Sequence, residues 1–181
     1  MKKGFTLVEL LAVIVILGVI MSIAIPNIVA TIDRNKKSSY IEDAKRMISA
    51  AEYKIRSDSS IEYPTNDSIT VITLSKLDNS ELDESPYDTK YSKNKSFVAI
   101  AVESSVRVYN VHLVSCVDAK CENLGDNDIS KVRGINKANL TNLNGSGGID
   151  FVLKGAEVDL VDVNADAIRA KYFPTKTVKV Y

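Results

Sequence analysis

One carboxylate interrupts the longest apolar run of this chain. The sequence opens with MKKGFTLVELLAVIVILGVI, and Glu9 is the only charged residue between Gly4 and Asp33. An ionised side chain at the centre of a membrane helix costs on the order of 2.5–3.5 kcal/mol, and less near the end of the helix. Among packed apolar helices that cost rises again unless a cation lies beside the carboxylate. Glu9 therefore indicates a site that requires a cationic partner.

The two cysteines, Cys116 and Cys121, lie close together in the stretch CVDAKC. In an extracytoplasmic domain so close a pair predicts a disulfide, and the chain-entropy argument gives so small a ring about 2 kcal/mol at most. A zinc site that adds His112 to the two thiolates is the alternative, although it needs a fourth ligand and lacks the usual Cys-x2-Cys spacing. His112 is the only histidine, and its apolar neighbours favour a surface or structural role.

The other polar residues match no catalytic or cofactor-binding motif. The sequence contains neither the G-x-x-x-x-G-K-[ST] phosphate loop nor the G-x-S-x-G nucleophile turn. Acidic stretches at 121–128 and 159–166 carry oxygens that suit Ca²⁺, but neither matches the twelve-residue calcium loop, and turn chemistry explains them more simply. Basic and acidic residues number 23 each, so no electrostatic argument favours nucleic acid as a partner. We therefore expect no enzymatic activity, no metal and no cofactor.

The apolar run over residues 5–26 has the length that a helix needs to cross a bilayer core. A secretory signal peptide is one interpretation, with Lys2 and Lys3 ahead of the run and small residues at 22–24, but the run is too long and contains Glu9. A plain membrane anchor explains the length and leaves Glu9 unexplained. The third interpretation is a segment that first anchors the chain and later packs in a polymer.

The stretch KKGFTLVELLAVIVILG resembles the N-terminal motif of type IV prepilins and of the related pseudopilins of type II secretion and DNA-uptake machines. The resemblance implies a leader of residues 1–4 that a membrane-embedded prepilin peptidase removes on the cytoplasmic side. The cut would fall between Gly4 and Phe5, and Phe5 would then be N-methylated. Gly4 has no side chain, so the backbone can enter a protease cleft closely. Glu9 corresponds to the acidic residue of the family.

The same resemblance supplies the cation. An α-amino group has a pKa of about 7.7–8.0, so the new amine at Phe5 is mostly cationic and can pair with Glu9 of the same or a neighbouring chain. In the family this pairing is thought to set the axial register of the subunits, and Thr6 adds a hydroxyl to the same cluster. The segment from Gly18 to Pro26, two residues that weaken helices, corresponds to a stretch that is often unwound in filaments.

A helix is predicted over residues 5–56, with an apolar first half and an amphipathic second half. Apolar residues in the second half recur at steps of three and four, at Ile41, Ala44, Ile48, Ala51 and Ile55. We predict an α+β fold in which this helix packs on a small antiparallel sheet, within a head of residues 57–181. The strand candidates are 96–104, 106–114, 149–155, 157–163 and 177–181. A polar loop is predicted over 57–68 and a long surface region over 125–148, whereas 69–82 and 166–173 are ambiguous.

The resemblance implies a structural subunit of a type IV pilus or pilus-like surface filament. Its partners would be further copies of the chain, the prepilin peptidase and methyltransferase, the pilus assembly platform and the membrane. The chain would begin as a single-pass membrane precursor with its head outside the cytoplasm and end in an extracellular filament. A minor pilin, or a pseudopilin of a secretion or DNA-uptake machine, is the alternative. A membrane-anchored binding protein or enzyme is the rival from another class.

Overall fold

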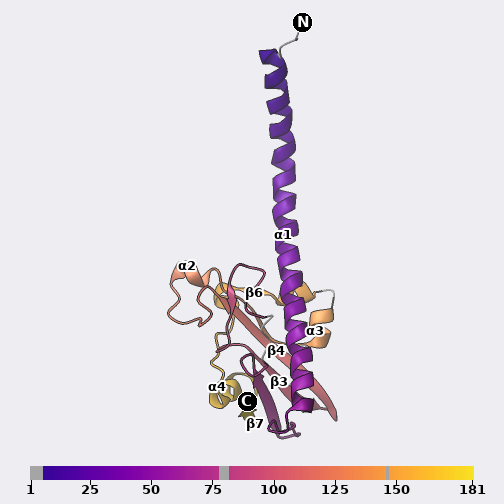
Figure 1. Ribbon diagram of the computed structural model, residues 1–181, viewed down its shortest axis with the longest axis vertical. Coiled ribbons are helices and arrows are strands. Elements are labelled where there is room, and N and C mark those ends of the chain that lie inside the picture. Colours follow the sequence, from indigo (N-terminus) through magenta and orange to yellow (C-terminus); the bar gives the residue numbers. More distant parts are fainter. Residues whose placement is uncertain (1–5, 78–81, 146) are drawn as a thin grey trace. The chain divides into compact units, whose positions relative to one another are not determined.

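The computed structural model describes residues 6–77, 82–145 and 147–181 (Figure 1). The chain divides into two compact units, residues 1–36 and residues 37–181. The helices and strands, in chain order, are α1 (Leu7–Ser57), β1 (Ser68–Thr73), β2 (Lys90–Tyr91), β3 (Phe97–Glu103), β4 (Val106–Cys116), α2 (Asp126–Ile129), β5 (Arg133–Asn139), α3 (Leu140–Asn144), η1 (Gly148–Phe151), β6 (Leu153–Lys154), η2 (Gly155–Glu157), α4 (Ala165–Tyr172) and β7 (Thr177–Val180).

Helix α1 is 51 residues long and confirms the single long helix expected from the sequence. It runs without interruption through Gly18 and Pro26, so the single chain does not show the unwinding expected between them. Proline removes one backbone donor and leaves the carbonyl of Ser22 without its usual partner, which weakens the helix without ending it. Unwinding of this segment in an assembled filament stays a prediction.

The second half of α1 packs on one face of a sheet, within the unit of residues 37–181 (Figure 1). Its buried residues are Tyr40, Ile41, Ala44, Met47, Ile48, Ala51 and Ile55, which include all five that the periodicity picked out. They contact apolar side chains from the helix-facing side of the strands: Ile72, Val98, Ile100, Val111, Leu113, Ile135 and Ala138. The amphipathic stripe is therefore the seam between helix and sheet.

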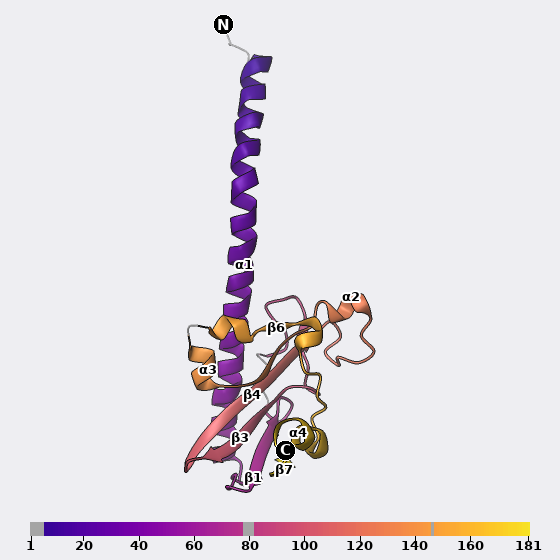
Figure 2. The same ribbon diagram turned by 180° about the vertical axis from the view of Figure 1, so that it is seen from behind.

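The sheet has seven strands in the described part of the chain, with the order β6-β5-β4-β3-β1-β7 and with β2 paired to the end of β4 (Figure 2). All neighbours run antiparallel except β1 and β7, which are parallel. The expectation of an antiparallel sheet is therefore wrong at this one pair. The chain leaves the sheet, forms α4 and re-enters beside β1 in the same direction, which is how parallel strands must be connected.

The predicted strands 96–104 and 106–114 form the β3–β4 hairpin. Ser104 and Ser105 make its two-residue turn with φ angles of 50° and 66°. Positive φ at both central residues gives the turn whose twist matches that of the flanking strands. Predicted strand 177–181 corresponds to β7, and ambiguous segment 166–173 becomes α4, whose start is capped by the Asn164 side chain.

Two of the strand predictions are wrong. Segment 149–155 contains the end of η1 and only two strand residues, and segment 157–163 pairs with no strand. Its backbone is held by the Asn136 side chain, which donates to the carbonyl of Glu157 and accepts from the amide of Asp159. These contacts satisfy backbone hydrogen-bonding groups of an extended segment that is not paired with any strand.

Three strands, β1, β2 and β5, lie where the sequence pattern contains no clear strand signal. β5 lies within the predicted surface region 125–148, and β1 opens the ambiguous segment 69–82. After β1, the Thr73 hydroxyl accepts from the amide of Lys76 and caps a single turn instead of a helix.

Two further apolar clusters complete the head. The face of the sheet opposite α1 carries Ile69, Val71, Phe97, Ala99, Ala101 and Val178, which are covered by Ile168 of α4 and by Phe173. A third cluster gathers around the two cysteines: Val114, Cys116, Cys121, Val132 and Val158. Both faces of the sheet are thus buried.

Candidate functional site

Thr6 and Glu9 form a reciprocal hydrogen-bonded pair at the first turn of α1. The backbone amide and the hydroxyl of Thr6 both donate to Oε2 of Glu9, each at 2.8 Å. In return, the backbone amide of Glu9 donates to the Thr6 hydroxyl at 3.3 Å. This is a capping box, in which the N-cap residue and the third helical residue satisfy each other's free backbone donors. Glu9 therefore has a role in its own helix before any second chain is present.

Thr6 was expected beside Glu9 from the sequence, whereas the capping box was not predicted. The signal was available, because T-L-V-E matches the S/T-x-x-E pattern of such boxes. Gly4 and Phe5, the residues of the predicted cleavage and methylation, lie outside the described residues. Those two predictions are therefore untested by the structure.

The first part of α1 exposes apolar side chains on every side. Within this helix an 18-residue window is apolar enough to cross a membrane, and none of that window is buried. The large apolar residues there are each 46–81% exposed: Leu7, Val8, Leu10, Leu11, Val13, Ile14, Val15, Ile16, Leu17, Val19, Ile20, Met21, Ile23, Ile25, Ile28, Val29 and Ile32. A helix that is apolar all round needs lipid or other helices to cover it.

The few polar side chains of this segment bond back to their own helix. The Ser22 hydroxyl donates to the carbonyl of Val19 at 2.7 Å, the Asn27 amide donates to that of Ile23 at 3.2 Å, and the Thr31 hydroxyl donates to that of Asn27 at 2.8 Å. Local bonds of this kind satisfy polar groups where no water is present. Glu9 is also bonded within its own first turn, but unlike these three residues it carries a charge.

His112 of β4 lies in a buried polar cluster on the face opposite α1. Its Nε2 donates to the backbone carbonyl of Asp159 at 2.9 Å, and the Tyr172 hydroxyl donates to the Asp159 carboxylate at 2.9 Å. The ring stacks on Phe97 with 5.0 Å between centroids. Burial lowers the pKa of His112 to about 4, against a smaller opposite effect of its bond to Asp159. His112 is therefore a neutral structural histidine, one of the two roles that its neighbours suggested.

Cys116 and Cys121 are joined by a disulfide in the structure. Both are buried, and Asp118 between them accepts from the amides of Lys120 and Cys121. With both sulfurs in a disulfide, neither can act as the thiolate that the zinc alternative requires. No group of three metal-ligating side chains occurs within the residues that the structure describes.

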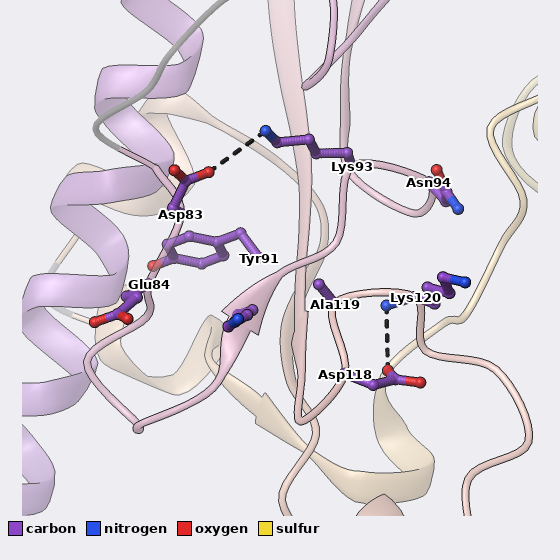
Figure 3. Close-up of a pocket in the computed structure, with 9 residues that line it drawn as sticks. Asp83, Glu84, Tyr91, Lys93, Asn94, Asp118, Ala119 and Lys120 are labelled. Atoms are coloured by element: carbon purple, nitrogen blue, oxygen red, sulfur yellow. Dashed lines mark hydrogen bonds and ion pairs between the residues drawn. The ribbon is translucent and has the colours of Figure 1, made fainter.

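One cavity of the head has a lining of mixed charge (Figure 3). It measures about 580 Å³ and lies between the segment around β2 and the disulfide loop; its lining is Asp83, Glu84, Lys90, Tyr91, Lys93, Asn94, Asp118, Ala119 and Lys120. Several of these groups are already engaged in local structure. Asp83 pairs with Lys93 at 3.4 Å, and the Tyr91 hydroxyl donates to Asp43 of α1. The cavity holds no recognisable catalytic arrangement.

Comparison with known proteins agrees with the site at the start of α1. Residues 1–25 match the family described as the prokaryotic N-terminal methylation motif. Over 67 residues the chain is 36% identical to the type II secretion system core protein G of Klebsiella michiganensis. This stretch covers 36% of the chain and 45% of that relative. The chain thus matches less than half the length of this curated relative. No solved structure gives a significant match.

Proposed function

We propose that this pilin-like protein is the structural subunit of a type IV pilus or pilus-like surface filament. It is made as a membrane-anchored precursor, cut after Gly4 by a prepilin peptidase and methylated at Phe5. One observation carries the proposal: a helix segment that is exposed and apolar on every side begins with a single carboxylate. A plain anchor needs the apolar surface, and its first turn could be capped without a charge, because glutamine also serves at this position of a capping box.

The apolar helix serves in two environments in succession. In the membrane, lipid covers its side chains, and after assembly the helices of neighbouring subunits cover them instead. Lipid tails and leucine side chains are similarly apolar, so this transfer costs little for the Leu, Val and Ile residues. Glu9 is the residue for which the two environments differ most, because its charge must be paired inside the filament.

Cleavage supplies the missing charge. A chain that starts at Phe5 has a cationic amine, and methylation to a secondary amine keeps that charge. Pairing of this amine with Glu9 of a neighbouring subunit favours one axial position, because every other position strands a buried charge at a cost of about 3–5 kcal/mol. Glu9 thus acts as a register device rather than as a main source of stability.

The head forms the filament surface in this proposal. Its two apolar faces are covered by α1 and by α4, so it is a folded body that does not need a partner to bury its core. Subunits of the same kind are the main partners, together with the peptidase, the methyltransferase and a membrane assembly platform. The final location is an extracellular filament.

A second candidate is a pseudopilin of a type II secretion machine. The identity to core protein G of such a system favours it. The same precursor processing and the same Glu9 pairing apply to both candidates. They differ in the abundance of the chain: a major pilin is the bulk constituent of purified surface filaments, whereas a pseudopilin or minor pilin is found there only in traces.

Substitution of Glu9 by leucine tests the proposal. We expect Glu9→Leu to insert into the membrane and to lose its leader at a normal or near-normal rate, but to be poorly incorporated into filaments. Ser22→Leu is the matched control, since it also replaces a polar residue of the same segment, one that bonds only to its own helix. Filament yield is measured by shearing and immunoblotting. Normal filament yield with Glu9→Leu would show that the carboxylate has no role in assembly.

A further inference from the structure

β7 is an edge strand whose outer side carries unpaired backbone groups. It lies at the end of the sheet beside β1, next to α4 (Figure 2). We propose that this edge is an interaction surface for the same strand of a second copy of the chain. The two β7 strands pair antiparallel about a two-fold axis and join the sheets of two heads. This surface is separate from the start of α1 and goes beyond the proposed function.

The hydrogen-bond pattern of β7 determines which of its backbone groups are free. The amides of Thr177 and Tyr181 donate to carbonyls of the β1 segment, each at 2.9 Å. In a parallel pair alternate residues make these bonds, so the amides and carbonyls of Val178 and Val180 point away from β1. These groups have no partner in the described part of the chain. Another extended chain is the partner that matches such a row of donors and acceptors.

The features that usually protect an edge strand are weak in β7. At the opposite end of the sheet β6 has only two residues, whereas β7 has four and contains neither proline nor a bulge. Its one charged residue, Lys179, forms an ion pair with Glu62 of its own chain. Short length, proline, bulges and unpaired lysines are the means by which proteins prevent edge pairing. The backbone of β7 is therefore open to another strand.

Two copies of β7 are complementary to each other when they run antiparallel. With Val178 opposite Val180 of the second copy, these residues exchange a pair of hydrogen bonds, and the two-fold axis repeats the pair, so about four bonds form in all. Both valines lie in or beside the apolar cluster on the α4 side of the sheet, so their pairing extends that cluster. The two Lys179 side chains meet at the axis, where the two Glu62 carboxylates balance their charge.

The strength of this contact depends on how many heads are presented together. One pair is weak, because a few backbone hydrogen bonds must offset the entropy lost on association. Many heads on one membrane or filament form many pairs at once, which strengthens the contact. Neighbours within one filament are related by a rotation with a translation, whereas a two-fold axis has no translation. The pairing therefore joins heads of two membranes or two filaments.

Clustering of vesicles tests this surface without requiring filament assembly. The full chain is reconstituted in phosphatidylcholine vesicles, and clustering is followed by light scattering. Val180→Pro removes an outward amide but none that bonds to β1, and Val180→Ala is the matched control because it keeps that amide. We expect clustering with the unsubstituted chain and with Val180→Ala, and loss of clustering with Val180→Pro. Amide hydrogen exchange of Val178 and Val180 should be slower in clustered vesicles than in dilute detergent micelles.

A charge exchange tests the pairing at the axis. Lys179→Glu brings like charges together there and should abolish clustering. Lys179→Glu combined with Glu62→Lys restores opposite charges and should recover clustering. Near-ultraviolet circular dichroism of tyrosine checks that the head of each variant is folded.

The outcomes distinguish this inference from the proposed function. Dispersed vesicles with the unsubstituted chain would overturn the inference, as would clustering that survives Val180→Pro or Lys179→Glu. Loss of clustering with Val180→Ala would assign the contact to the valine side chain and would also overturn pairing through the backbone edge. Normal filaments from Glu9→Leu would instead remove the proposed register role and leave this surface unaffected.

Discussion

Acid should destabilise the head through His112. The folded head holds this histidine neutral, because burial lowers its pKa to about 4, whereas the ordinary value is 6.5. As pH falls below 6.5 the unfolded chain binds a proton that the folded chain does not bind, so stability falls with pH until the folded pKa is reached. The interval from 6.5 to about 4, at ~1.36 kcal/mol per pH unit, gives a loss of about 3 kcal/mol.

Other groups titrate in the same range, so the contribution of His112 must be isolated by a variant. His112→Gln keeps an amide donor for the carbonyl of Asp159 but cannot titrate. Its free energy of unfolding will be lower than that of the unsubstituted chain at pH 7, because the stacking on Phe97 is lost. The difference between the two proteins should shrink by about 3 kcal/mol between pH 7 and pH 4.

The assay is urea unfolding of the full chain in detergent micelles, followed by near-ultraviolet circular dichroism of tyrosine. All eight tyrosines lie at or after Tyr40, so the signal reports on the head and not on the first part of α1. A difference between the two proteins that stays constant from pH 7 to pH 4 would refute the reasoning. It would mean that His112 remains as easy to protonate in the folded head as in the unfolded chain.

Three sets of substitutions test the packing of the head by the same assay at pH 7. Gly134→Ala should lower the free energy of unfolding by about 1–3 kcal/mol, because a Cβ there would lie 2.4 Å from a methyl group of Val158, and adding Val158→Ala should recover part of the loss. Replacing both Cys116 and Cys121 by serine should cost about 2 kcal/mol, and reductant should have a similar effect on the unsubstituted chain but none on the variant. Tyr40→Phe should cost about 1–2 kcal/mol, since the buried hydroxyl lies within 3.3 Å of three acceptors on β4 and β5; an unchanged stability would show that this hydroxyl does not anchor the helix.

The elements with a regular apolar period were predictable from the sequence. The stripe on the second half of α1 follows the helical period, and the β3–β4 hairpin joins two runs of β-branched residues through Ser104 and Ser105. In both cases the local pattern and the burial in the fold agree. The long helix, the hairpin and the α+β class therefore followed from local physics.

The errors occurred where tertiary contacts decide the structure. Strand β5 contains Gly134 and several polar residues, so its sequence looks like a loop. In the fold it lies between β4 and β6. The absence of a side chain at Gly134 leaves the space that a methyl group of Val158 occupies. Segment 157–163 alternates like a strand, but its backbone bonds to the Asn136 side chain instead of to a neighbouring strand. No window of a few residues contains that information.

The candidate site was predictable in part. The charge of Glu9 inside an apolar run marked it from the sequence alone, and the motif around it suggested the amine of Phe5 as its partner. The local pattern T-L-V-E predicts the capping box, whereas the charge of Glu9 alone does not indicate it. Which oxygen of Glu9 accepts from Thr6 could be learned only from the structure.

The central claim is that proteolysis after Gly4 creates the cation that Glu9 needs. Intact-mass and N-terminal fragment mass spectrometry of the chain from cells with an active prepilin peptidase tests it most directly. We expect a chain that lacks Met1–Gly4 and carries one added methyl group at Phe5. A chain that begins after Ala24, or one that keeps its first four residues in such cells, would contradict it.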